Sequence, residues 1–192
     1  MQLLLASKSP RRRELLGRLD IPVTIVDVDV DERVAETLPA EQVAEALARL
    51  KADGYKAEMA ADEVLVTADT VVVLGSRVLC KPHSRKEAVE MLHSLSGKVH
   101  QVYTGVCLRS RDRSVAFSER TDVHFRQLTD GEIDHYVDVY KPFDKAGAYG
   151  IQEWIGMVGI ERIEGCYYNV MGLPLARLYR ELMSLTGKVK EA

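Results

Sequence analysis

The chain has 192 residues, of which 46% are hydrophobic and 29% charged, and its formal net charge at pH 7 is -3. This length and composition are ordinary for a soluble globular protein with one substantial core or two closely joined lobes. The slightly acidic balance gives no reason to expect stable binding to nucleic acid.

Cysteines, histidines and apolar runs exclude several classes of protein. Cys80, Cys107 and Cys166 are widely spaced without a CxxC pair, which is typical of reduced cysteines in a cytoplasmic protein. The five histidines show no zinc spacing. The apolar residues 3–6 are too few for a signal peptide or a membrane span. We therefore expect a cytoplasmic protein that does not bind membranes.

The first element is a short buried strand over residues 3–6, followed by the start of a helix. Ser9 suits the N-cap and Pro10 suits the first helical position. The turn is crowded with cations, although cations destabilise a helix N-terminus. These basic residues are Lys8, Arg11, Arg12 and Arg13. With the Ser7 hydroxyl and free backbone N–H groups they predict a phosphate-binding turn, and the alternative is an exposed basic turn.

Residues 23–30 alternate in polarity and predict a strand. Asp27, Asp29 and Asp31 would fall on one face of it, which favours a solvated edge strand that resists aggregation. Glu32, at the end of this strand, stays open as a ligand for a divalent metal.

Residues 39–59 predict a helix with Val43, Leu47 and Leu50 on one face and Gly54 weakening its later part. Lys51 and Lys56 would lie on this helix, and the pattern alone makes both of them solvent-exposed lysines.

Residues 64–74 contain one carboxylate, Asp69, between β-branched residues that predict buried strands on both sides. A charge in such surroundings is costly, so Asp69 is a candidate site residue. The alternative is an aspartate that caps a turn between two strands. After a turn at residues 75–77, a returning strand at 78–80 leads to Lys81. This hairpin would bring Asp69 and Lys81 to neighbouring strands.

The rest of the chain mixes helices and strands. Helices are predicted from the capping box at residues 84–87 through residue 95, after the capping box at 129–132, and over 174–185. Strands at 99–109 and 115–127 predict a hairpin, and residues 141–152 predict an ordered functional loop. The order of elements predicts an α/β protein with a mixed sheet, and no linker divides the chain.

Three separated stretches resemble the Maf family of nucleoside triphosphate pyrophosphatases. They are residues 6–12, residues 68–70 together with Lys81-Pro82, and residues 144–152, and Gly172-Leu173-Pro174 also matches. The resemblance spans nearly the whole chain in the order of the family. It implies one inosine-triphosphatase-like domain over residues 1–192, with an elongated mixed sheet, flanking helices and two lobes around a cleft.

The resemblance further implies hydrolysis of dTTP and UTP to the monophosphate and pyrophosphate, with magnesium, manganese or cobalt as the divalent metal. Asp69 would accept the proton, and Glu32 and Asp69 would hold the metal. The triphosphate would be bound by Ser7, Arg11, Lys51 and Lys81. Base preference would be set by Arg12, Thr70 and Gln152. The family also suggests a homodimer.

Two alternatives to this function remain. The first is the same reaction on modified nucleotides, and the second is a nucleotide-sensing regulator of septum formation that binds without turnover. The regulator needs the phosphate pocket but not Asp69, so a carboxylate retained in a costly setting favours the enzyme.

Overall fold

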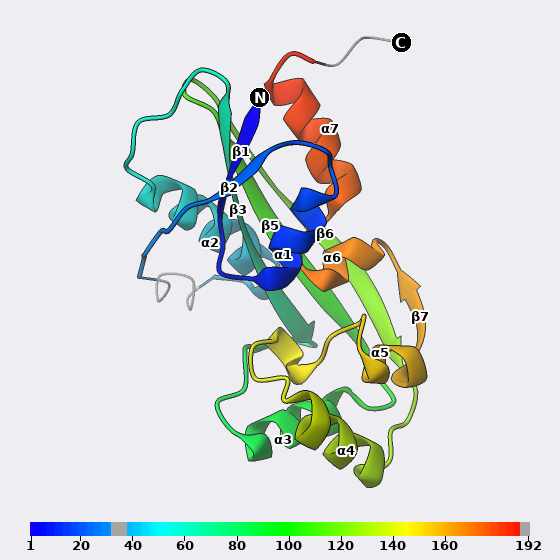
Figure 1. Ribbon diagram of the computed structural model, residues 1–192. Helices are drawn as coiled ribbons and strands as arrows, with labels where there is room; N and C mark the ends of the chain where they lie inside the picture. Colours follow the sequence, from blue (N-terminus) through cyan, green and yellow to red (C-terminus); the bar gives the residue numbers. More distant parts are fainter. Residues whose placement is uncertain (32–37, 189–192) are drawn as a thin grey trace. The chain divides into compact units, whose positions relative to one another are not determined.

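The computed structural model describes residues 1–31 and 38–188 and is a mixed α/β structure, as predicted (Figure 1). Glu32, the predicted metal ligand, lies outside the described residues. Within them the strands form one seven-stranded sheet in the order β2-β1-β3-β5-β6-β7, and β4 pairs with β3. The strands are β1 (Gln2–Ala6), β2 (Val23–Ile25), β3 (Glu63–Leu74), β4 (Arg77–Leu79), β5 (Val99–Arg109), β6 (Ser114–Phe125) and β7 (Ile160–Glu164).

The pairing of β3 explains its apolar sequence. It runs parallel to β1, with Leu4 opposite Leu65, and antiparallel to β4, with Val72 opposite Leu79. Residues 64–68 and 71–73 are buried. β-Branched side chains fit this environment because both faces of the strand are covered.

Local signals in the sequence set the starts of several helices. Ser9 accepts a hydrogen bond from the Arg12 N–H at the start of α1, and Thr129 and Glu132 form a complete capping box at α4. The helices are α1 (Pro10–Gly17), α2 (Ala40–Gly54), α3 (Arg85–Leu95), α4 (Asp130–Tyr140), α5 (Trp154–Gly159), α6 (Tyr167–Met171) and α7 (Leu175–Leu185), with a 3₁₀ turn η2 (Ala146–Ala148). No helix in residues 1–31 or 38–188 is both long and apolar enough to cross a membrane.

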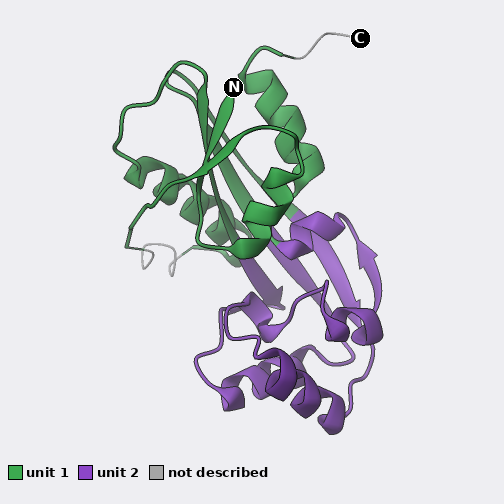
Figure 2. Cartoon of the chain, in the orientation of Figure 1, with its two compact units in different colours: residues 1–69, 104–119, 172–192 green, residues 70–103, 120–171 purple. Residues whose placement is uncertain are grey.

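The chain divides into two compact units (Figure 2). Unit 1 comprises residues 1–69, 104–119 and 172–192, and unit 2 comprises residues 70–103 and 120–171. In unit 1 a core cluster that includes Leu4, Ala48 and Leu65 joins α2 to the sheet. In unit 2 a larger core includes Leu92 of α3 and Ile133 of α4. Each unit therefore has apolar packing of its own.

Two predicted boundaries are wrong. The strand predicted over residues 23–30 ends at Ile25, and Asp27, Asp29 and Asp31 lie beyond it. Its partner β1 ends at Ala6, where the chain turns toward α1, so no neighbour continues the ladder. β2 does lie at an edge of the sheet, as expected.

The helix predicted over residues 39–59 ends at Gly54, so Lys56 lies outside it. A Cβ placed on Gly54 would lie 2.5 Å from Cγ1 of Val30 and 2.9 Å from Cγ1 of Val28. The glycine therefore allows a neighbouring segment to pack closely against the end of α2.

Candidate active site

Asp69 lies within β3, and its Oδ1 accepts a hydrogen bond from Nζ of Lys51 at 2.6 Å. Each of the two side chains is 18% exposed. The interpretation of Asp69 as a cap between two strands is wrong, because residues 63–74 form one unbroken strand. A carboxylate in this largely apolar setting needs an opposite charge, and Lys51 supplies it.

Lys51 lies on α2, which packs closely against β3 and β5 within unit 1. Thr67 Oγ1 donates a hydrogen bond to the Ala48 carbonyl at 2.6 Å. A Cβ on Gly105 of β5 would lie 2.2 Å from the carbonyl carbon and oxygen of Ala44. The prediction that Lys51 is a solvent-exposed lysine is therefore wrong. The spacing of apolar residues along α2 could not predict this, because it does not show which strand the helix packs against.

The turn between β1 and α1 has the predicted helix-start geometry. Ser9 is extended, and its Oγ accepts a hydrogen bond from the Arg12 N–H at 3.5 Å. Ser7 Oγ accepts from the Ser9 N–H at 3.3 Å and from Nη1 of Arg12 at 3.4 Å. Arg11 lies on the same turn and is half-buried. Hydroxyls, guanidinium groups and a helix N-terminus are thus combined in one short segment, which suits phosphate.

Arg12 connects this turn to the residue that precedes Asp69. Its Nη1 donates to the Ala68 carbonyl at 2.8 Å, and its Nε donates to the Gly172 carbonyl at 2.8 Å. Side chains that the sequence singled out separately are thereby gathered within unit 1. These are Ser7, Arg12, Lys51 and Asp69.

Thr70, Lys81 and Gln152 lie in unit 2, which begins at Thr70. The predicted hairpin of β3 and β4 is confirmed. Lys81 follows the end of β4, is exposed, and precedes the buried Pro82.

The predicted functional loop packs against this hairpin inside unit 2. The Gly147 N–H donates to the Cys80 carbonyl at 3.2 Å, and a Cβ on Gly147 would lie 3.0 Å from Cγ1 of Val72. Gly147 has a φ of +69°, which few side chains tolerate. Gln152, at the end of the loop, has a buried Oε1 without a hydrogen-bond partner among the described residues. A buried acceptor of this kind can be satisfied by a water or by a donor group of a ligand.

The expected divalent metal would need several oxygen ligands. Across residues 1–31 and 38–188 no three His, Cys, Asp or Glu side chains cluster as a metal site. Asp69 provides one carboxylate, a hard oxygen ligand that suits magnesium when phosphate oxygens complete the coordination.

Comparison with known proteins gives near full-length matches. The family model described as Maf-like protein matches residues 2–185. A dTTP/UTP pyrophosphatase of Parabacteroides distasonis is 52% identical over 182 residues, covering 94% of each chain. Proteins of the same name are 50% identical in Bacteroides thetaiotaomicron, over 96% of each chain, and 49% identical in Porphyromonas gingivalis, over 94% of this chain and 92% of that protein.

Proposed function

The chain belongs to the Maf family, and we propose that it hydrolyses dTTP and UTP to the nucleoside monophosphate and pyrophosphate. One structural observation supports the hydrolysis chemistry of this proposal. The Lys51–Asp69 pair is joined to the basic turn through the contact of Arg12 with the Ala68 carbonyl. A carboxylate able to take a proton is thereby linked to a segment suited to polyphosphate.

Neutralisation of the triphosphate is the first requirement of this reaction, because water approaches a highly charged phosphate chain poorly. Ser7 and Arg11 would donate hydrogen bonds to phosphate oxygens from the turn before and at the start of α1. Lys51 and Lys81 would add ammonium donors. A lysine has three N–H donors, so Lys51 can donate to Asp69 and to a phosphate oxygen together.

Proton transfer is the second requirement. Asp69 would accept a proton from the water that attacks the α-phosphorus, and pyrophosphate would leave. A positioned general base contributes on the order of 10²–10⁴-fold to the rate. Asp69, with Glu32, would also hold the divalent metal, which when bound supplies further charge neutralisation on the phosphates.

Base recognition is assigned to Gln152, with Thr70 and Arg12. Thymine and uracil each present a ring N–H beside carbonyl oxygens. The buried Oε1 of Gln152 would accept from that ring N–H, and its amide N–H would donate to a carbonyl. Cytosine has an acceptor at the same ring position, so CTP would leave the amide oxygen unsatisfied.

A nucleotide screen tests the proposal. The full chain is incubated with dTTP, UTP, CTP, GTP, ATP and modified nucleotides in magnesium, manganese or cobalt, and released pyrophosphate is measured. Turnover in oxygen-18 water then identifies the phosphorus attacked from the labelled product. We expect pyrophosphate release with dTTP and UTP. Orthophosphate as the first product would overturn the proposal.

The same screen separates the two alternatives. Turnover confined to modified nucleotides would indicate a different substrate range for the same site. Tight nucleotide binding without turnover in any of these metals would favour the nucleotide-sensing regulator of septum formation.

A further inference from the structure

A buried polar network lies beside Gln152 in unit 2, and the reaction described above does not use it. Lys145 is 8% exposed, and its Nζ contacts a carboxylate oxygen of Asp144 at 2.8 Å and one of Glu153 at 3.0 Å. The hydroxyl of Tyr136, a fully buried residue, donates to the second carboxylate oxygen of Glu153. Lys145 and Glu153 are thus joined to Tyr136 of α4.

The network is connected to the backbone on both sides of Gln152. The Gly150 N–H donates to the Tyr136 hydroxyl at 3.0 Å. The Glu153 N–H donates to the Gly150 carbonyl at 3.0 Å and closes a turn that contains Gln152. A Cβ on Gly150 would lie 2.9 Å from Cδ of Glu153 and 3.1 Å from Cε of Lys145, so the backbone lies directly against the charged groups.

The largely buried charges of Lys145 and Glu153 call for a functional explanation, because apolar side chains of similar volume would fill the same space at lower desolvation cost. Burial, with the Glu153 carboxylate, raises the pKa of Tyr136, so its hydroxyl stays protonated and remains a donor. Directional hydrogen bonds fix a backbone turn more narrowly than apolar contacts do. The buried Oε1 of Gln152 is the feature of this turn that benefits from fixed geometry.

We propose that Glu153, held by Lys145 and Tyr136, is a positioning residue that holds the Gln152 carboxamide in place for the pyrimidine base. The inference rests on the proposed base recognition by Gln152. A fixed acceptor favours the ring N–H of thymine and uracil over the ring nitrogen of cytosine. A mobile carboxamide would present its oxygen to the ring N–H of thymine and uracil and its own N–H to the ring nitrogen of cytosine, and would therefore discriminate less.

Tyr136→Phe and Glu153→Gln test this role in the full chain. The first removes one oxygen atom and keeps the ring, and the second keeps the shape of the side chain but removes its charge. We expect kcat/KM for dTTP and UTP to fall at least about tenfold, and that for CTP to change less, so that the dTTP/CTP ratio falls. Equal losses on all three nucleotides would overturn the inference and make the network purely structural.

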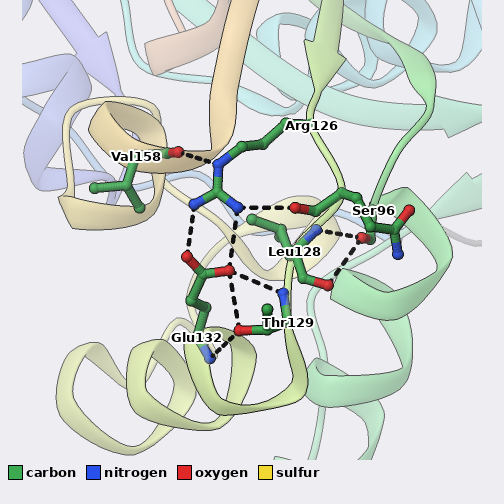
Figure 3. A network of polar contacts seen from close by, with 7 residues as sticks. Ser96, Arg126, Leu128, Thr129, Glu132 and Val158 are labelled. Carbon is green, nitrogen blue, oxygen red and sulfur yellow. Dashed lines mark hydrogen bonds and ion pairs between the residues drawn. The ribbon is translucent and has the colours of Figure 1, made fainter.

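Glu132→Gln is the matched control, because it weakens a different polar network of the same unit (Figure 3). Glu132 accepts hydrogen bonds from Arg126 at 2.6 and 3.1 Å, and Arg126 also donates to the Val158 carbonyl. This variant should lower the melting temperature without changing the dTTP/CTP ratio. A ratio that falls equally in the control would also refute the inference.

A double-mutant cycle separates this inference from the proposed function. If Glu153 acts through Gln152, Glu153→Gln should not change the dTTP/CTP ratio further in a Gln152→Ala background. If Gln152→Ala alone leaves the ratio unchanged, base recognition by Gln152 fails. If Gln152→Ala changes the ratio and Tyr136→Phe does not, only the positioning role fails. Tyr136→Phe decides the matter if Glu153→Gln does not fold.

Discussion

Asp69 places a charge in the mostly buried strand β3, and Lys51 lies 2.6 Å from it. The pair has two separable properties, the hydrogen bond and the capacity to accept a proton. A carboxamide at position 69 retains the first, because its oxygen still accepts from the Lys51 ammonium, and loses the second. This residue therefore offers the sharpest test of the chemistry.

Asp69→Asn should lower kcat for dTTP at least about a hundredfold while nucleotide binding is retained. Turnover and equilibrium binding of dTTP are measured on the same preparation. Asp53→Asn, which changes an exposed aspartate of α2, is the control and should behave like the parent. Near-normal turnover of the Asp69→Asn variant would make Asp69 structural.

Arg12 combines a predicted specificity role with structural contacts. Its guanidinium donates to the Ala68 and Gly172 carbonyls and to Ser7 Oγ. A lysine ammonium cannot reproduce this planar arrangement. Arg12→Lys should therefore destabilise the protein by about 2 kcal/mol and lower kcat/KM for every nucleotide. Urea unfolding and kinetics with four nucleotides check this, and an altered base preference with parental stability would show that the carbonyl contacts contribute nothing.

At the scale of elements, the approach of α2 to β5 sets the place of Lys51. The approach depends on Gly105, which faces the backbone of Ala44 with no room for a side chain. The Thr67 hydrogen bond to the Ala48 carbonyl holds the same helix one turn further along. Both contacts lie within unit 1 and fix the helix that carries Lys51.

Gly105→Ala should displace α2, cost about 1–3 kcal/mol of stability and reduce turnover. Gly17→Ala is the matched control, because a Cβ at Gly17 meets nothing within 4 Å. That substitution, at the end of α1, should leave turnover unchanged and stability equal or slightly higher. Differential scanning calorimetry and dTTP turnover measure the two effects, and equal behaviour of both variants would contradict the packing argument.

At the scale of the whole molecule, stability toward acid should be lost in two overlapping pH windows. Burial lowers the pKa of His100 from 6.5 to about 3, and hydrogen bonds from Arg126 and the Thr129 backbone lower that of Glu132 from 4.5 to about 2. In each case the unfolded state binds the proton more readily. Each contribution is therefore complete above the ordinary pKa and is lost as the pH falls toward the lowered one.

His100→Phe should flatten the pH dependence of stability between about pH 6.5 and 4.5, where the parent loses up to about 1.4 kcal/mol per pH unit through this residue. A phenyl ring keeps the contacts of His100 with the Phe125 and Tyr149 rings and loses its hydrogen bond with the Tyr149 hydroxyl, so the comparison uses the pH dependence and not the absolute stability. Glu132→Gln should change the dependence only below about pH 4.5. Urea unfolding from pH 8 to pH 3.5 measures the pH dependence of stability in both variants. Identical curves for the parent and His100→Phe would contradict the prediction for His100.

Signals that act over a few residues were sufficient for much of the fold. The Ser9-Pro10 helix start, the Thr129–Glu132 capping box and the β3–β4 hairpin all appear as predicted. Element ends that depend on distant partners do not. β2 ends opposite Leu5, one residue before β1 itself ends, and α2 ends at Gly54, against Val28 and Val30.

The same distinction between local and distant signals applies to the candidate site. Asp69 was recognisable because a charge among β-branched residues is unfavourable, and this is visible in the order of residues. Two other features could not be recognised from the sequence. One is the hydrogen bond from Arg12 to the Gly172 carbonyl, which joins residues 160 positions apart. The other is the turn around Gln152 that Glu153 and Tyr136 hold. Helical or strand spacing states which face a side chain occupies, and packing of separate segments determines what it meets there.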